Sequence, residues 1–345
     1  MKGLLVHIGA DTTTLSVVAP IFPDDTFEYI PIKEIYGLGI KTYRDIPARN
    51  TKYGRTLADF LPSDLARLPV HLDPNFDNFT YGEPFKEQPK FWTLMKLAEG
   101  DLIFFIASLA PYNPEIYEKR DALLRSYQVG RRDKYVVGFF QVKGIAEVYV
   151  MKSKSRLALA MLNIYVLLEE GASPLDLKSL KYEIRRLEEY GYIMERNGRY
   201  EFTEEGLRII DGLLEDLSGR TESEQYELLE KGSFEVRQLI GEVAEEDVKG
   251  NQHYKRLRDL DWDHFIVIKG KPESSALLKR AVKLTEGFEG YWFKLNELGR
   301  EVLQRKYDSL RGMRWINKKA ATKLVQEISR CNKEMVEELQ RNLLK

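Results

Sequence analysis

A short stretch of the chain, residues 69–82, gathers side chains that could carry out acid–base chemistry or recognise a polar ligand. Its sequence is PVHLDPNFDNFTYG, which contains a histidine, two aspartates, two asparagines, a threonine and a tyrosine. The prolines and the turn-forming Asn and Asp residues disfavour a long helix, and the three aromatic rings disfavour a solvated linker. We therefore expect an ordered loop that presents His71, Asp73 and Asp77 as a candidate site. The alternative is an irregular loop whose polar side chains only cap its own turns.

A second polar cluster, with the sequence NQHYKR at residues 251–256, stands shortly before an apolar run. If both clusters form one site, Asp73 or Asp77 could act as a general base, and His71 or His253 as a general acid or phosphate partner. Two histidines and two aspartates could alternatively hold a divalent metal ion, because both residue types are metal ligands. The sequence contains no HExxH, P-loop, GxGxxG, GxSxG or CxxC motif, so neither a metal ligand nor a cofactor is assigned.

Composition restricts the class of protein. A chain of 345 residues predicts two domains. The balance of 53 basic and 54 acidic residues means that any nucleic-acid site must come from local clustering. A single cysteine excludes an intrachain disulfide. The absence of an apolar run of ~18 residues predicts a cytoplasmic protein without a membrane partner. Abundant Glu, Lys and Arg with one cysteine are typical of a thermophile protein.

The hydrophobic pattern predicts an α+β fold. Apolar runs predict strands at residues 3–8, 102–107, 135–142, 145–150 and 263–270. An alternating pattern predicts a further strand at residues 27–32, and residues 274–281 are expected to form a helix with a serine cap. We expect a discontinuous β-rich domain with helices, residues 1–152 plus 233–303, built on a small curved or barrel sheet.

The sequence pattern changes near residue 153, and the pattern of residues 153–218 predicts an inserted winged helix-turn-helix. Glycines at 171 and 191 end two helices, and a hairpin is expected around Asn197-Gly198 before a final helix. Residues 219–232 are expected to form a helical connection back to the first domain, and residues 304–345 to form C-terminal helices.

Two groups of basic residues could contact phosphates. One lies in a loop interleaved with aromatic residues, and the other on the expected recognition helix; the residues are Arg49, Lys52 and Arg55 in the first group and Lys181, Arg185 and Arg186 in the second. Basic residues beside aromatic rings suit phosphate contacts and base stacking. A solvated loop and a winged helix used for dimer contact are the respective alternatives.

Several motifs occur in one order along the chain, namely LLVHIGADTTT, TYRDIPARNTKYG, LPVHLDPNFDNFTYGE, GDLIFF, YVVGFFQV, and NQHYKR followed by HFIVIKGKPESSALLKRAVKLTE. Together they resemble the third of the nucleotide-modification-associated domains, over residues 1–150 and about 233–303. That family is known mainly by its genomic company with nucleic-acid-modifying systems. The resemblance implies a shared pocket made by the polar signature residues Asp11, Thr12, His71, Asp73, Asp77, Tyr81, His253 and Arg256. The strand pattern of residues 101–150 is also similar to the PUA, EVE and ASCH barrels, which bind RNA or modified bases.

Three functions follow. The first expectation is a nucleic-acid-binding protein that recognises a modified or flipped base in DNA or RNA. The second is an enzyme of nucleotide or nucleic-acid base modification that uses the His/Asp pocket. The third is a regulatory module that forms a homodimer through the winged helix or the C-terminal helix. A distance above ~15 Å between His71 and His253 would exclude a shared nucleotide-sized pocket.

Overall fold

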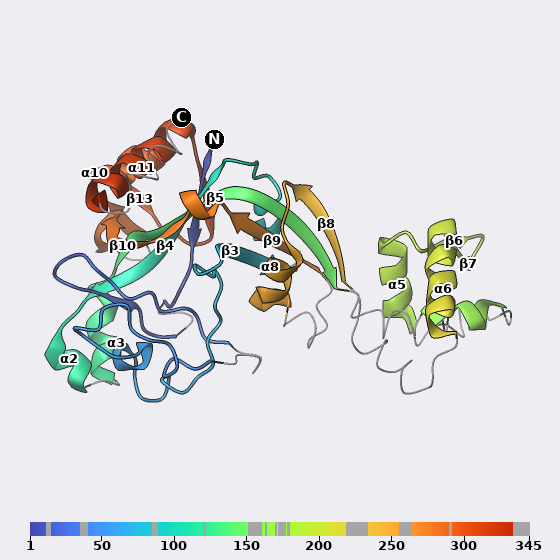
Figure 1. Cartoon of the computed structure of the whole chain (residues 1–345), viewed down its shortest axis with the longest axis horizontal. Helices are drawn as coiled ribbons and strands as arrows, with labels where there is room; N and C mark the ends of the chain where they lie inside the picture. The colour runs from blue at the N-terminus through green and yellow to red at the C-terminus, as the bar shows by residue number, and fades with distance from the viewer. Residues whose placement is uncertain are drawn as a thin grey trace. The chain divides into compact units, whose positions relative to one another are not determined.

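A computed structural model of the chain describes all residues except 12–14, 35–40, 85–88, 120–121, 151–160, 163, 170, 172–176, 178–179, 219–233, 255–263, 290–291 and 334–345. The chain divides into two compact units (Figure 1). Unit 1 comprises residues 1–147, 238–255 and 265–345, and unit 2 comprises residues 148–237 and 256–264. No helix within the described ranges is long and apolar enough to cross a membrane.

Unit 1 is built on a large sheet, which has nine strands within the described residues. Its main path runs in the order β14-β1-β4-β5-β9-β3, while β10 and β8 pair with β5, and β2 pairs with β4. These strands are β1 (Gly3–His7), β2 (Ala19–Ile21), β3 (Thr80–Pro84), β4 (Leu102–Pro111), β5 (Asp133–Val150), β8 (Phe234–Ile240), β9 (His264–Gly270), β10 (Ala276–Lys283) and β14 (Met313–Ile316).

The centre of this sheet follows from its continuous apolar sequence. Strand β4 is buried from Leu102 to Ala110, and it pairs parallel with β1 and antiparallel with β5. A strand covered on both faces needs such an uninterrupted apolar run. The mixed sheet with its helices confirms the expected α+β class. Across the described strands the path from β14 to β3 stays open, so the small closed barrel considered from the sequence is not formed there.

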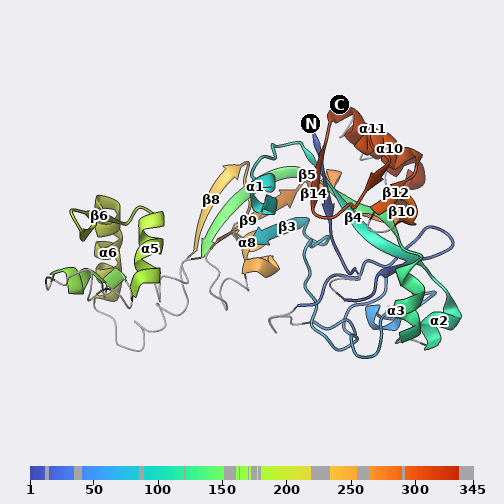
Figure 2. The same cartoon turned by 180° about the vertical axis from the view of Figure 1, so that it is seen from behind.

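Helices flank the sheet and connect its strands. The short ones are η1 (Leu57–Phe60), α1 (Pro89–Leu94), α2 (Pro114–Lys119), α3 (Ala122–Val129) and α8 (Glu245–Gly250). Helix α1 packs beside β3 (Figure 2). Helices α10 (Glu297–Leu303) and α11 (Lys318–Cys331) pack on each other, and α11 also contacts β1 and β10. The contact face of α11 is apolar and buried at Ala321, Leu324 and Ile328.

The predictions of two elements from local sequence patterns are wrong. Residues 274–281 are not a helix, because a 3-10 turn, η3 (Pro272–Ser274), leads into strand β10. The spacing of the apolar residues in this segment fits both a helix and a strand. Strand β5 supplies backbone hydrogen-bonding partners for β10, and this pairing selects the strand. Residues 27–32 do not form a strand. Phe27 makes an isolated bridge with Ile21, and the adjacent Thr26 makes one with Arg280.

A small sheet is formed by β11 (Thr285–Glu289), β12 (Trp292–Leu295) and β13 (Tyr307–Asp308). Residues 304–345 differ from the expected run of helices, first at β13. Strand β14 then pairs antiparallel with β1 before α11 begins. Residues 307–308 and 313–316 are therefore strands, because the backbone of β12 and the edge of β1 satisfy their hydrogen bonds.

Unit 2 has a small core of its own. It contains α5 (Lys181–Glu189), a hairpin of β6 (Ile193–Arg196) and β7 (Arg199–Phe202), and α6 (Glu204–Leu217). Asn197 and Gly198 both take positive φ values, 52° and 73°, which the tight hairpin turn requires. The winged helix-turn-helix assignment of residues 153–218 stays a prediction. The predicted helical connection, residues 219–232, lies outside the described residues.

The ring of Phe76 lies close to Gly138 of β5, and this contact provides a test of packing. An added Cβ at Gly138 would lie 2.5 Å from Cε1 of Phe76 and 2.9 Å from the carbonyl oxygen of Ala276. We expect Gly138→Ala to lower the free energy of unfolding by about 1–3 kcal/mol through overpacking, measured by urea denaturation. Gly130→Ala is the matched control, because nothing lies within 4 Å of its added Cβ. Equal stability of the two variants would contradict this account of the loop.

Candidate functional site

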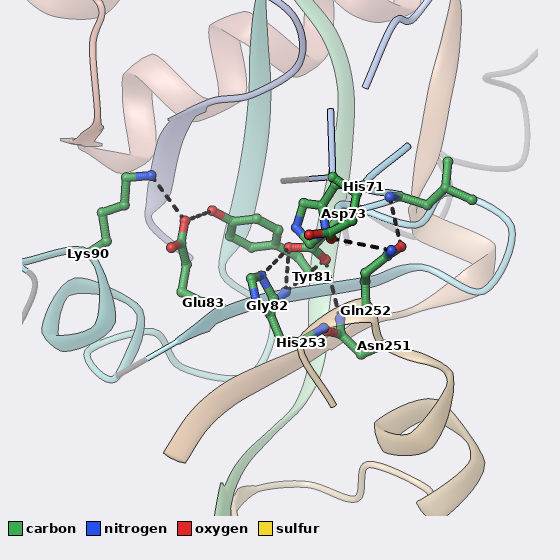
Figure 3. Close-up of polar contacts among 11 residues, drawn as sticks. His71, Asp73, Tyr81, Gly82, Glu83, Lys90, Asn251, Gln252 and His253 are labelled. Atoms are coloured by element: carbon green, nitrogen blue, oxygen red, sulfur yellow. Dashed lines mark hydrogen bonds and ion pairs between the residues drawn. The ribbon is translucent and has the colours of Figure 1, made fainter. Parts of the chain in front are cut away.

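The candidate site is organised by the buried carboxylate of Asp73. This group accepts hydrogen bonds from the backbone N–H of Gly82, at 3.0 and 3.2 Å to its two oxygens, and from Nδ2 of Asn251 at 3.2 Å (Figure 3). Its Oδ2 also lies 3.2 Å from Nε2 of His253. A buried carboxylate needs several donors to offset its lost hydration. Asp73 therefore joins its own loop to β3 and to the distant segment at residues 251–253.

His71 lies on the other side of this centre. Its Nδ1 is 3.2 Å from Oε2 of the buried Glu34. The rings of His71 and His253 are 4.9 Å apart between centroids and are inclined by 73°. This separation is far below the ~15 Å limit of a nucleotide-sized pocket. The hypothesis of one shared site for the two sequence clusters therefore stands.

The three residues His71, Asp73 and His253, here called the triad, offer a set of metal donors. One ligand atom from each residue lies within 4.8 Å of the other two, and the residues are 3%, 8% and 4% exposed. Two imidazoles and one carboxylate suit zinc, iron and manganese ions. The arrangement can hold a divalent ion, or it can exchange protons between imidazole and carboxylate groups.

A set of neutral side chains fixes the triad. Oε1 of Gln252 accepts a hydrogen bond from the backbone N–H of Leu72 at 3.0 Å, and its Nε2 donates to the carbonyl of Val70 at 3.3 Å. Oδ1 of Asn251 accepts from the backbone N–H of His253 at 2.9 Å. Both amides lie beside His253 in the sequence, so the short NQH run supplies one triad member and its supports.

Gly82 is required where β3 passes the triad. A Cβ at this position would lie 2.9 Å from Oδ1 of Asn251 and 2.9 Å from Cδ2 of His253. Any larger residue would push these side chains away from Asp73. Gly82, Asn251 and Gln252 lie in the two polar clusters but were not singled out as site residues, and Glu34 was not predicted at all. A glycine inside a strand is a local signal of close approach.

Tyr81 links the triad region to a charged pair. Its hydroxyl donates to Oε1 of Glu83, which also lies 3.2 Å from Nζ of Lys90 (Figure 3). Burial raises the pKa of Tyr81, and the nearby carboxylate of Glu83 raises it further. Tyr81 is therefore a protonated hydrogen-bond donor at neutral pH.

A second polar cluster in unit 1 contains Asp11 but none of the triad. Nζ of Lys134 lies 2.7 Å from Oγ of Ser108 and 2.7 Å from Nε2 of His7. Nδ1 of His7 is in turn 3.9 Å from Oδ2 of Asp11. We call Asp11, His7, Lys134 and Ser108 the lysine cluster. Apart from Asp11, its members were missed, because nothing in the local sequence marks Lys134 as buried.

Burial controls the charges of the lysine cluster. It lowers the pKa of Lys134 from 10.5 to about 7; Asp11 opposes this change, whereas the cationic Arg132 and Arg311 add to it. Burial and, to a smaller extent, the neighbouring Lys134 together lower the pKa of His7 to about 3. His7 is therefore neutral at pH 7, and Lys134 gives up its proton far more readily than an exposed lysine.

The remaining predicted site residues lie elsewhere. Asp77 is exposed at the tip of the loop, outside the triad. Nη2 of Arg49 donates to the carbonyl of Leu278 at 2.8 Å, so this residue ties loops together. The other predicted residues are placed as follows: Lys52 and Arg55 are exposed, Arg185 pairs with Glu189 at 3.3 Å, Lys181 and Arg186 belong to α5, and Thr12 and Arg256 are outside the described residues.

Comparison with known proteins gives one finding. Residues 2–163 match the family model described as nucleotide modification associated domain 3. The resemblance expected from the ordered motifs is confirmed for these residues, and the family description associates them with nucleotide modification. Searches of curated proteins and of solved structures returned no match.

The lowered pKa of Lys134 predicts a pH dependence of stability. Between about 7 and 10.5 the unfolded chain holds a proton on this lysine that the folded chain has lost. The free energy of unfolding should therefore rise with pH across this window, by up to about 1.4 kcal/mol per pH unit from this group. We expect Lys134→Met to remove that rise in urea denaturation series at several pH values. If the free energy of unfolding changes with pH in the same way for wild type and variant, the lowered pKa of Lys134 is contradicted.

Proposed function

We propose that this chain, whose residues 2–163 match nucleotide modification associated domain 3, is an enzyme that acts on a nucleotide, free or within DNA or RNA, through a divalent metal ion held by the triad. The observation that carries the proposal is the convergence of His71, Asp73 and His253 within 4.8 Å. The family match supports a nucleotide as the substrate class, and the donor set supports metal-dependent chemistry.

The distances within the triad fit an ion. Two ligands that are each about 2.1 Å from a metal and subtend 90–110° are separated by about 3.0–3.4 Å. The 3.2 Å between Nε2 of His253 and Oδ2 of Asp73 falls in this interval. The third ligand atom is at most 4.8 Å away, so a small movement of the His71 side chain completes the set.

The groups around the triad support the same function. Glu34 lies against Nδ1 of His71, as carboxylates do beside metal-binding histidines, where they orient the ring and raise its basicity. Asn251 and the backbone of Gly82 hold the carboxylate of Asp73 in place. A bound ion would polarise a substrate oxygen or activate water. The chain's own residues would orient the ligands and keep bulk water away.

A protein that recognises a base without turnover is the second candidate, and one surface feature favours it. Trp92 on α1 is 52% exposed, and Lys90 lies on the same short helix. An exposed indole suits base stacking, whereas the ammonium group of Lys90 pairs with Glu83 at 3.2 Å. Contacts of the predicted winged helix with phosphates, and its use in a homodimer, are further proposals that binding and oligomer measurements can address.

The metal site is tested by metal content and affinity. We expect the purified chain to bind about one divalent ion per chain, assayed with zinc and manganese by elemental analysis and calorimetric titration. Asp73→Ala and His253→Ala should each weaken binding by more than the ~10–100-fold that loss of an outer-shell partner costs. Asp77→Asn is the matched control, because Asp77 lies on the same loop and is exposed. Full binding by the triad variants would remove the proposed site.

Turnover separates the two candidates. The protein is incubated with nucleoside triphosphates, duplex and single-stranded DNA, and RNA, with modified bases included, at two salt concentrations, and the products are analysed by mass spectrometry. We expect a modified product that disappears with a chelator and in Asp73→Ala. Binding with a preference for a modified base, without a product, would reject the enzyme and support the protein that recognises a base without turnover. If neither a product nor binding is observed, both the enzyme and the base-binding protein are rejected.

A further inference from the structure

Lys134 is a buried lysine whose close partners are neutral. It is 3% exposed, and its Nζ contacts Oγ of Ser108 and Nε2 of His7, each at 2.7 Å. No carboxylate among the described residues lies within ion-pairing distance of this ammonium group. Lys269, by contrast, pairs with Asp247 at 2.6 Å. The fold thus places one amine where its charge is poorly compensated.

The strand register fixes this amine in place. Ser108 of β4 and Lys134 of β5 are directly paired across the two strands, so their side chains share a face of the sheet. His7 ends β1, which pairs in parallel with β4. The backbone N–H of Lys134 also donates to Oγ1 of Thr285 at 2.8 Å. Lys134 is therefore held rigidly, as a catalytic amine must be.

The surroundings favour the neutral amine and attract anions. Burial and the cationic Arg132 and Arg311 lower the pKa of Lys134, while Asp11 opposes them. The ring of Phe293, 5.2 Å from Nζ, covers another side. A lysine that is desolvated next to other cations is an activated nucleophile towards carbonyl compounds. The side chains of His7 and Asp11, 11% and 17% exposed, connect the cluster to solvent.

We propose that Lys134 is a nucleophile that forms an imine with an aldehyde carried on a phosphorylated molecule. The lone pair of Nζ attacks the carbonyl carbon, and a C–N bond forms. Both amine protons pass to the carbonyl oxygen, which leaves as water as the C=N bond forms, so no oxidant or reductant is consumed. Neutral His7 and the hydroxyl of Ser108 are placed to relay these protons. Arg132 and Arg311 supply the charge that a phosphate requires.

The phosphorylated aldehyde could be a small molecule or a base-free sugar within a nucleic acid. Both present an aldehyde near a phosphate, and both suit the cluster equally. This activity is separate from the proposed metal chemistry, because the triad and the lysine cluster share no residue. A test of one leaves the other unaffected.

The test traps the imine by reduction. Wild-type protein is incubated with glyceraldehyde 3-phosphate and sodium borohydride, and the adduct is located by peptide mass spectrometry. We expect labelling concentrated at Lys134, with a rate that rises as the pH passes through about 7. Unphosphorylated glyceraldehyde should label this site about tenfold more slowly, because it lacks the anionic group. A duplex oligonucleotide with a base-free site forms the second arm, in which a covalent complex identifies the nucleic acid as the aldehyde source.

Two variants control the experiment. Lys134→Met should lose the major adduct, whereas Lys269→Met should retain it, because that lysine is paired with a carboxylate. Since the adduct is mapped in wild-type protein, the test does not depend on the folding of a variant. An adduct spread evenly over surface lysines, no phosphate preference at Lys134, or no trapping in either arm would overturn the proposal.

Discussion

The buried carboxylate of Asp73 is the constraint on which the candidate site depends. A charge removed from water must be matched by donors, and Asp73 obtains them from its neighbour strand β3 and from Asn251, while Nε2 of His253 lies 3.2 Å from its Oδ2. Asp73 and β3 precede residues 148–237 of unit 2 in the sequence, whereas Asn251 and His253 follow them. The return of the chain at residue 238 is therefore a condition for a satisfied Asp73, and the discontinuity of unit 1 is part of how the site is made.

The two polar clusters of unit 1 surround buried groups of opposite charge type, a carboxylate and an amine. Around Asp73, amide and imidazole groups stabilise a buried anion, and the network holds its histidines in fixed orientations. Around Lys134, a hydroxyl and a neutral imidazole provide hydrogen bonds without a countercharge, so the proton is held weakly. The first arrangement favours the binding of a cation. The second favours a neutral amine.

The sequence predicted features that depend on local composition. The apolar runs of β4 and β9 and the Asn-Gly turn of unit 2 were found because their signals lie within a few residues. The residues His71, Asp73 and His253 were found because polar groups were dense around them. Lys134, Ser108 and Glu34 were missed because their burial depends on pairing across the fold. Strand β10 was mistaken for a helix for the same reason, since the edge of β5 decides its conformation.

The burial of the triad bears on which function it can serve. A base edge is several ångströms wide, and hydrogen bonding to it needs donors and acceptors that face an opening. Asp73 is 8% exposed, and its oxygens already accept bonds from Gly82 and Asn251. Reading a base at this position would break those bonds and leave a buried charge poorly compensated, at a cost of several kcal/mol. A bound ion would instead add compensation to Asp73. We therefore propose a metal centre at the triad, and base recognition at an exposed surface such as that around Trp92.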